Sequence, residues 1–385
     1  KVQILVFCLC LFLTVTAILA AVIDVDTVLT KVNKPFVKSI QSADGDIIDC
    51  VDIYKQPAFD HPLLVNHTLQ LEPTSYPEEV LRNDIGRGEE IMTQIWHRNG
   101  SCPEGTIPIR RRRRREEITM RGKKRPFTVH MDAVNQQFIN HEHAIGYVNQ
   151  GPYYGARGTF NVWKPNTQID TEFSVSQLWI VAGDSQPETE TVEAGWQVYP
   201  DYYKSSKEPI FFVFWTRDYY QSTGCYNLDC PGFVQVSKRI SLGSAIAPVS
   251  QYNDKQYEIT ILIWEDRETK NWWLHSFGEV IGYWPASLFK ALPEKGSRLV
   301  EWGGEVLDLR IGGQHTTTEM GSGHWPEEGF HKAAYVSDLR IVDQTTKLYP
   351  AKGVRTLAAD RNCYSANLVR GNWLYYGGPG RNPNC

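Results

Sequence analysis

Residues 257–264, Tyr-Glu-Ile-Thr-Ile-Leu-Ile-Trp, decide the fold class of this chain. Side chains of a β-strand repeat every two residues, so one face of this segment would carry Tyr257, Ile259, Ile261 and Ile263. The other face would carry Glu258, Thr260, Leu262 and Trp264. Comparable apolar and aromatic runs, bounded by Gly, Asn, Asp and Pro, occur at 192–200, 209–215, 232–236, 272–277, 299–306 and 334–339. A short helix is predicted at 285–292. Many short strands predict an all-β sandwich or barrel.

The composition of the 385 residues agrees with a β-rich globular protein. It includes 12 Trp and 19 Tyr, and aromatic side chains favour strands. The formal net charge of -4 gives no reason to expect nucleic acid as a partner. The sequence has no internal repeat and no GxGxxG, P-loop, HExxH or GxSxG motif, so we expect neither a cofactor nor a serine-hydrolase site.

Residues 1–21 have the pattern of a secretory signal peptide. An apolar run follows Lys1 and ends in Ala17, Ala20 and Ala21, which are small residues of the kind that signal peptidase requires. The alternative is a retained membrane anchor, because the run is nearly long enough to span a bilayer. We predict cleavage after Ala20 or Ala21, and a secreted product without a stable membrane anchor.

Six cysteines lie beyond the predicted signal peptide. Their locality in the sequence favours the disulfides Cys50–Cys102, Cys225–Cys230 and Cys363–Cys385. Zinc binding is the alternative, but none of the six forms a CxxC pair, so no metal site is expected. Glycosylation acceptor sequences begin at Asn66 and Asn99 and fit an exported chain, although such sequences also occur unmodified.

We predict a small first domain at 22–105 and a larger second domain at 127–385, joined by a basic linker at 106–126. The first domain contains a hairpin signal, with strands at 37–40 and 47–54 around an Asp-Gly turn. The linker contains six consecutive arginines, whose mutual repulsion favours a solvated segment that is open to proteolytic processing. A nuclear-localisation signal is the other interpretation, and it conflicts with the signal peptide.

The strand predicted at 192–200 presents polar side chains on one face. Alternation places Glu193, Gly195, Gln197 and Tyr199 on that face and apolar residues on the opposite one. Because glycine has no side chain, Gly195 is expected to leave an open space between Glu193 and Gln197.

The strand predicted at 299–306 carries a second carboxylate of this kind. Gly303 and Gly304 precede Glu305, and they are expected either to bulge the strand or to clear room over it. Glu301 has the same parity as Glu305 unless a bulge resets the register. Near a turn between these two strands, Tyr219 is a further candidate for lining a cleft.

Two carboxyl groups that meet across a sheet can hydrolyse a bond. A carboxylate takes a proton from a water, and a protonated carboxyl donates a proton to the carbonyl oxygen and later to the leaving amine. Carboxyl groups in contact share a proton and work best in acid. The competing interpretation is that Glu193 and Glu305 are solvated strand residues. His141 and His143 share a strand face as in some metal sites, but without a clear third ligand a structural or surface role is favoured.

Taken together, the motifs of the chain resemble those of the neprosin family of plant secreted proteins. In the first domain the resemblance rests on DIIDCVDIYKQPAFDHPLL from residue 46 and QIWHRNGSCPEGTIPI from residue 94. In the second domain it rests on HEHAI from 141, FSVSQLWI from 173, EAGWQVYP from 193, TGCYNLDCPGFVQ from 223, GYWP from 282, WGGEV from 302 and MGSGH from 320.

The resemblance implies an antiparallel β-sandwich catalytic domain preceded by a small, β-containing activation domain, which covers the cleft and is removed at low pH. It implies an acid endopeptidase that cuts protein or peptide substrates beside proline, with Glu193 and Glu305 as its two catalytic glutamates. We hypothesise that these glutamates activate a water and that Gln197 or a nearby tyrosine steadies the oxyanion. Trp196 and Trp302 would form a proline-accepting wall, since a flat ring stacks on pyrrolidine.

The destination of the product and two alternative functions stay open. The cell wall, the apoplast and the vacuole all fit a secreted chain. A glycoside hydrolase also uses two carboxylates and aromatic platforms. A non-catalytic cell-wall binding protein would carry the same glutamates incidentally. The arginine run leaves two maturation routes, self-cleavage and cutting by a protease that recognises basic sites.

Overall fold

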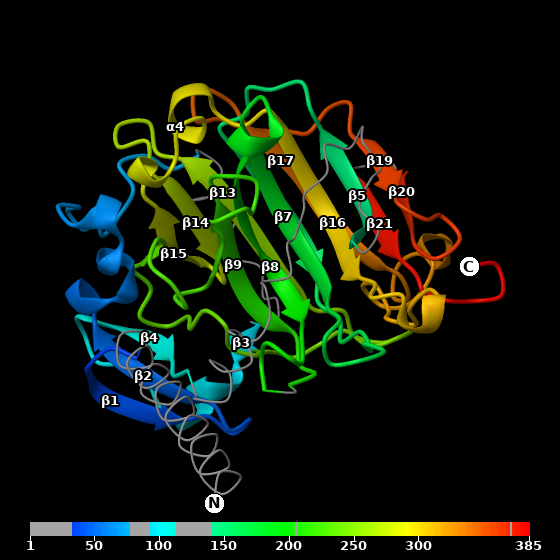
Figure 1. Cartoon of the computed structure of the whole chain (residues 1–385), viewed down its shortest axis with the longest axis horizontal. Coiled ribbons are helices and arrows are strands. Elements are labelled where there is room, and N and C mark those ends of the chain that lie inside the picture. The colour runs from blue at the N-terminus through cyan, green and yellow to red at the C-terminus, as the bar shows by residue number, and fades with distance from the viewer. Residues whose placement is uncertain (1–32, 78–91, 113–140, 205, 370–371) are drawn as a thin grey trace, which may run out of the picture.

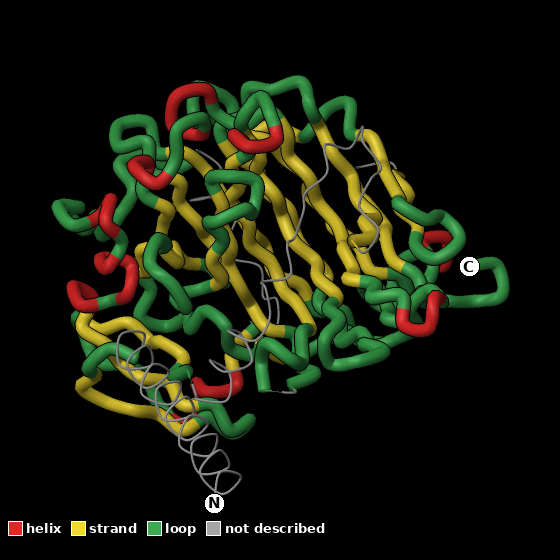
Figure 2. The backbone as a smooth tube through the Cα atoms, viewed as in Figure 1, coloured by secondary structure: helices red, strands yellow, loops and turns green. Residues whose placement is uncertain are grey.

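The computed structural model describes residues 33–77, 92–112, 141–204, 206–369 and 372–385. The predicted signal peptide and most of the predicted linker lie outside these residues. The described chain is mostly β, with two large antiparallel sheets packed face to face and a small sheet to one side (Figure 1, Figure 2). The predicted fold class, a β-sandwich preceded by a small β-containing domain, is therefore confirmed.

The first large sheet has seven strands in the order β10-β9-β8-β7-β16-β5-β19. Their bounds are β10 (Cys225–Tyr226), β9 (Ile210–Thr216), β8 (Glu190–Val198), β7 (Ser174–Ala182), β16 (Leu299–Leu307), β5 (His141–Val148) and β19 (Arg355–Ala358). Every residue of β8, β7, β16 and β5 is buried. These four neighbouring strands form the centre of the sheet (Figure 1).

The second large sheet has nine strands and packs against the first. Its order is β11-β15-β14-β13-β6-β17-β21-β20, with β18 paired to β17. The bounds are β11 (Val234–Gln235), β15 (Glu279–Trp284), β14 (Trp272–Ser276), β13 (Glu258–Glu265), β6 (Gly155–Asn161), β17 (Ala334–Val342), β21 (Trp373–Gly377), β20 (Ser365–Val369) and β18 (Leu348–Pro350). The predicted strand at 257–264 is β13, and Ile259, Ile261 and Ile263 enter the core between the sheets as their parity predicts.

Helical segments among the described residues are short. They are α4 (Leu292–Lys295) and the 3-10 turns η1 (Ile53–Lys55), η2 (Pro57–Asp60), η3 (Pro62–Leu64), η4 (Ile95–Asn99), η5 (Gln186–Glu188), η6 (Ala286–Leu288), η7 (Ile311–Gly313) and η8 (Pro326–Glu328). The helix predicted at 285–292 is split into η6 and α4, because Phe289 is extended and Pro293 lacks the N–H that a continuous helix needs. None of the described helices is long and apolar enough to cross a membrane.

The first domain is built on a three-stranded sheet in the order β1-β2-β4. The bounds are β1 (Phe36–Gln41), β2 (Ile47–Asp52) and β4 (Thr106–Arg110). β1 and β2 form the predicted hairpin, and the Cys50–Cys102 disulfide joins β2 to the loop before β4. The predicted Cys225–Cys230 and Cys363–Cys385 disulfides are also present, so all three predicted pairings are confirmed.

The predicted boundary at residue 105 is wrong, because β4 belongs to the first domain. β4 pairs with β2 along its whole length, and the side chains of Ile107 and Ile109 are buried. The alternation of Thr-Ile-Pro-Ile at 106–109 is a strand signal that the adjacent arginine run obscured in the sequence.

The first three arginines of the run are ion-paired rather than solvated, which corrects the linker prediction for them. Arg110 Nε lies 2.9 Å from Asp46 Oδ2, and Arg111 Nε donates to Asp49 Oδ2 at 2.6 Å. Arg112 Nε lies 3.5 Å from Asp229 Oδ1 in the second domain. The rest of the run, 113–115, lies outside the described residues.

The first domain docks against one end of the seven-stranded sheet and the β11-β15 edge of the other. β3 (Thr93–Gln94) pairs with β12 (Ile246–Ala247) of the second domain. Gln56 donates to the backbone oxygen of Gln235 at 3.0 Å and accepts from its N–H at 2.8 Å. These are buried, directional contacts of the kind that fix one docking geometry.

Candidate functional site

Strand register places Glu193 and Glu305 on the same face of the seven-stranded sheet. Glu193 on β8 lies opposite Trp179 of β7, and Trp179 lies opposite Glu301 of β16. Glu305 lies four residues further along β16, opposite Val175. Register pairing runs unbroken through Gly303 and Gly304, so the strand is not bulged and Glu301 keeps the parity of Glu305.

The same register separates the two carboxyl groups. The Cα atoms lie two strands apart and four residues apart, which ideal spacings convert to roughly 16 Å. Two glutamate side chains that reach toward each other cannot close this gap, so the expected direct contact with a shared proton does not occur in this register.

Glu193 is held by three side-chain donors. Thr191 Oγ1 and Tyr220 Oη each donate to Oε1 at 2.7 Å, and Gln177 Nε2 donates to Oε2 at 3.1 Å. An ionised carboxylate only accepts hydrogen bonds, so this set of donors suits the charged form. The side chain is 1% exposed, which fixes its orientation.

Glu305 lies between two histidines of β5. Its Oε1 pairs with His141 Nδ1, and its Oε2 lies 3.6 Å from His143 Nε2. Both imidazoles reach Glu305 because alternate residues of β5 share the face on which β16 presents it. The two histidines therefore lie against a carboxylate of the candidate site, Glu305. The sequence alone did not predict this contact.

Gln177 on β7 lies between the two glutamates and was missed in the sequence. It is opposite Gly195 of β8 on one side and Gly303 of β16 on the other. A Cβ at Gly195 would lie 2.2 Å from the backbone oxygen of Ser176 and 2.4 Å from Gln177 Cβ. The expected open space at Gly195 is therefore filled by β7, and the glycine allows close approach of that strand.

The side-chain oxygen of Gln177 faces no donor in the described part of the chain. Oε1 of Gln177 is buried and has no hydrogen-bond partner there. The same is true of Oε1 of Gln197, whose Nε2 donates to Tyr203 Oη at 2.8 Å. Each amide thus presents a buried acceptor to the face that carries the glutamates, and a substrate N–H can satisfy such an acceptor.

The tyrosine that contacts Glu193 is Tyr220 rather than the predicted Tyr219. Both lie in the loop after β9, and the hydroxyl of Tyr219 accepts from Gln186 Nε2 at 3.2 Å. Burial raises the pKa of the neighbouring Tyr226, and the carboxylates of Glu193 and Glu305 contribute to this shift. Tyr226 therefore stays protonated.

Trp196 and Trp302 do not line this face, which corrects the proline-wall hypothesis. Both side chains are fully buried between the two sheets. Trp196 Nε1 donates to the backbone oxygen of Asn161 at 3.1 Å, and Trp302 Nε1 donates to that of Arg157 at 3.0 Å. Their parity is opposite to that of Glu193 and Glu305, so alternation alone excludes them from the site.

We expect Trp302→Phe to lower the free energy of unfolding by about 1–3 kcal/mol, through a small cavity and the lost indole hydrogen bond. Any preference for proline should be unchanged, because the side chain does not reach the face with the glutamates. Urea denaturation and cleavage of peptide pairs with and without proline would check both statements. A changed preference with unchanged stability would restore the wall hypothesis.

The two predicted glycosylation sites are accessible. Asn66 and Asn99 are both exposed on the first domain. Asn99 Nδ2 also donates to the backbone oxygen of Gln41 at 2.6 Å. Modification of either residue stays a prediction.

Comparison with solved structures finds glutamic peptidases at low similarity. A scytalido-glutamic peptidase bound to a peptide-based transition-state analogue matches at 10% identity and a TM-score of 0.34, over 62% of this chain and 98% of that one. The eqolisin-family peptidase SCP-B, in complex with the tripeptide Ala-Ile-His, matches at 12% identity and 0.33, over 62% and 96%. Similarity at this level carries no argument about the reaction.

Comparison with protein families gives a match over most of the described chain. The neprosin family model matches residues 170–379, which is more than half of the sequence. The neprosin activation peptide matches residues 39–147 and so extends into β5, which is part of the seven-stranded sheet. The chain therefore belongs to the neprosin family, with an activation-peptide region followed by a neprosin domain.

Proposed function

We propose that this chain is the secreted precursor of an acid-active glutamic endopeptidase in which Glu193 and Glu305 carry out peptide hydrolysis. The observation that carries the proposal is the register of β8, β7 and β16. It presents the two glutamates on one sheet face, with Gln177 between them and a glycine on either side of it. Family membership supports the same class of reaction.

In the proposed mechanism Glu193 is the base, because three donors hold it as an acceptor. A water in the gap gives its proton to Glu193 while its oxygen attacks the substrate carbonyl carbon. The second N–H of Gln177 Nε2 donates to the carbonyl oxygen as it becomes negative. Glu305 delivers a proton to the leaving nitrogen as the carbon–nitrogen bond breaks, and His141 is placed to resupply that proton.

The finer parts of the proposal are specificity, maturation and location. We infer cleavage beside proline, activation by removal of the first domain, and export to the cell wall, apoplast or vacuole. The test is cleavage of matched peptides with and without proline by the matured protein between about pH 3 and 7. Acid-limited cleavage beside proline supports the whole proposal. Release of sugars without peptide cleavage would favour a glycoside hydrolase instead.

Acid should weaken the docking of the first domain through histidines at its contact with the second. His67 Nε2 lies 2.8 Å from Tyr283 Oη, and His97 Nε2 lies 2.7 Å from the backbone oxygen of Arg239. The His61 ring packs on Trp215. Burial lowers the pKa of all three from the ordinary value of 6.5. The three histidines therefore bind protons more tightly in the released domain than in the docked one. Docking is consequently weakened as the pH falls below 6.5.

Asp46 acts in a lower pH range. Burial alone would raise its pKa, but Arg110 and Lys204 outweigh burial and hold the pKa below the ordinary value of 3.8. Arg110 belongs to the first domain and stays beside Asp46 after release, so only the ion pair with Lys204 of the second domain contributes to docking. That contribution is present while Asp46 is ionised and is lost as pH falls through the lowered pKa. The histidines should therefore act first on acidification and Asp46 only at stronger acidity.

The prediction can be measured on the full chain with a specific protease site placed between residues 113 and 140. After the cut, we expect the dissociation constant of the two domains to be larger at pH 5 than at pH 7. A histidine whose pKa is one unit lower in the docked state contributes a factor of up to about ten to this increase. The combined variant His61→Asn, His67→Gln, His97→Gln should flatten this dependence. His331→Gln, at an exposed histidine of the second domain, is the matched control. Equal pH dependence in all three proteins would contradict the prediction.

A further inference from the structure

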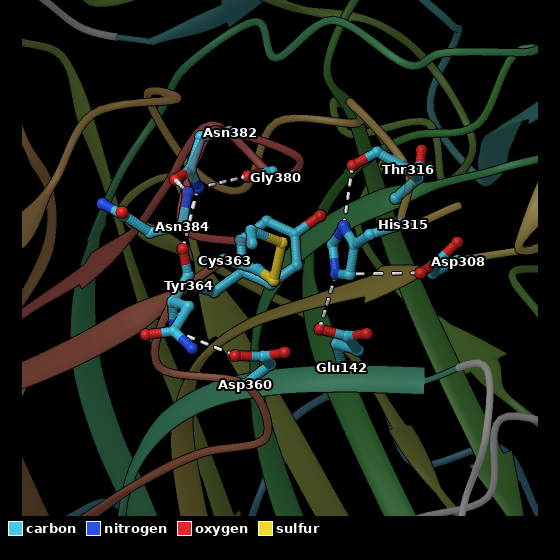
Figure 3. The surroundings of a disulfide bond; sticks show 12 residues. Glu142, Asp308, His315, Thr316, Asp360, Cys363, Tyr364, Gly380, Asn382 and Asn384 are labelled. Carbon is cyan, nitrogen blue, oxygen red and sulfur yellow. Dashed lines mark hydrogen bonds and ion pairs between the residues drawn. A yellow bond between two sulfur atoms is a disulfide. The ribbon is translucent and has the colours of Figure 1, made fainter. Parts of the chain in front are cut away.

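Glu142, Asp308 and His315 form a buried cluster outside the candidate active site. Figure 3 shows them beside the Cys363–Cys385 disulfide. One ligand atom from each of the three lies within 4.8 Å of the others, and all three residues are buried. They come from β5 and from the loop that follows β16. The nearby sulfur atoms are bonded to each other, so they are not thiolate ligands.

The imidazole of His315 is oriented by a backbone carbonyl. Its Nδ1 lies 2.8 Å from the backbone oxygen of Thr316, which only accepts, so Nδ1 carries a hydrogen. Nε2 then points at Oε2 of Glu142, 3.0 Å away, and at Oδ2 of Asp308, 3.7 Å away (Figure 3). Fixing Nδ1 on a carbonyl is how proteins orient a histidine whose Nε2 binds a metal ion.

One carboxylate oxygen at this point makes no hydrogen bond in the described chain. Oδ2 of Asp308, a residue with no exposed surface, makes no hydrogen bond in the described chain, although Arg310 Nε lies 2.9 Å away as an ion pair. The guanidinium of Arg310 also donates to Glu142 Oε1 at 3.0 Å. Its side chain is 41% exposed, so a positive charge now reaches the two carboxylates from the rim of the cluster.

We propose that Glu142, Asp308 and His315 bind a zinc ion. In a tetrahedral zinc site with bonds of about 2.0–2.2 Å, neighbouring ligand atoms are about 3.3 Å apart. The separations of 3.0 and 3.7 Å from Nε2 bracket that value. One nitrogen and two carboxylate oxygens suit Zn²⁺, whereas Ca²⁺ and Mg²⁺ favour oxygen ligands throughout. A water would complete the coordination.

The proposed ion would join two of the strands that carry the candidate active site, β5 and β16. Glu142 lies between His141 and His143 on β5 but points to the opposite face, and Asp308 follows the end of β16, three residues after Glu305. An ion that links Glu142 to Asp308 therefore fixes β5 against β16 below the Glu305–histidine contacts. Its function is structural, and it takes no part in the hydrolysis proposed above.

The test uses the full chain, stripped with a chelator and titrated with ZnCl₂ at about pH 7. We expect about one tightly held zinc per chain by elemental analysis, and a rise in Tm of about 5 °C at a hundredfold excess over Kd. His315→Gln should weaken binding at least about a hundredfold. His324→Gln removes a half-exposed histidine that also pairs with a glutamate, at 3.0 Å, and should change nothing. Absence of zinc from the wild-type chain, or equal binding by His315→Gln, would overturn the proposal.

Arg310→Ala keeps the test decisive if the histidine variant fails to fold. It leaves all three ligands in place and removes the competing positive charge. We expect zinc affinity to rise about tenfold, because the cation no longer meets a like charge at the rim. If the cluster is only an ion-pair network with a charged His315, Arg310→Ala will lower stability without any gain in zinc affinity, and the proposal fails.

Discussion

Glu193→Gln and Glu305→Gln should each lower kcat/KM for peptide cleavage by at least about a thousandfold in the matured protein. Glutamine keeps the size and much of the hydrogen bonding of glutamate but takes up no proton at the pH of the reaction. In Glu193→Gln the water loses its base, and in Glu305→Gln the leaving nitrogen loses its proton donor. The folds should survive, because glutamine has nearly the same size and shape as glutamate.

The sheet supplies a matched control for these variants. Glu301 lies on the same strand and the same face as Glu305, and it is equally buried. Glu301→Gln therefore repeats the loss of a buried carboxylate at a position outside the proposed mechanism, and we expect cleavage within about tenfold of wild type. Circular dichroism and urea denaturation of all three variants separate loss of chemistry from loss of fold.

Each other outcome would point to a different conclusion. If cleavage survives in Glu193→Gln and Glu305→Gln, the site assignment is wrong and another group activates the water. If Glu301→Gln abolishes cleavage and Glu305→Gln does not, the catalytic carboxylate of β16 is Glu301, four residues before Glu305. If the wild-type protein does not cleave peptides at any pH, the glycoside hydrolase and the binding protein become the leading alternatives.

Much of the fold was predictable because alternation is local. Strand β13 was visible in eight consecutive residues, and its isoleucines enter the core as their parity predicts. The disulfides were predictable from sequence proximity alone. The boundary error at residue 105 has a physical reason, since the charges of Arg110 and Arg111 suggest a solvated chain while their partners Asp46 and Asp49 are about 60 residues away. Ion pairs between distant residues leave no local pattern.

The candidate site was predictable only in part, because register is a property of strand pairs. Parity placed Glu193 on one face and Trp196 on the other, and had it been applied to Trp196 it would have excluded the proline-wall hypothesis. No pattern within 174–182 marks Gln177, because its importance comes from the two strands that pair with β7. The pairing of β5 with β16, which brings two histidines to Glu305, is equally nonlocal.

Gln177 provides the second large effect that we expect. Gln177→Leu should lower kcat about 100- to 1000-fold while KM changes little, because the lost N–H acts mainly on the oxyanion of the transition state. Leucine fills similar space and leaves Thr191 and Tyr220 on Glu193, so the base keeps two of its three donors. The matched comparison is Gln197→Leu, since Gln197 also presents a buried Oε1 and donates one Nε2 hydrogen, but it donates to Tyr203 and not to Glu193. We expect Gln197→Leu to cost less than about tenfold in kcat. The reverse order of the two effects would return the oxyanion role to Gln197, as the sequence first suggested, and would place the reacting carbonyl nearer to Glu305 than to Glu193.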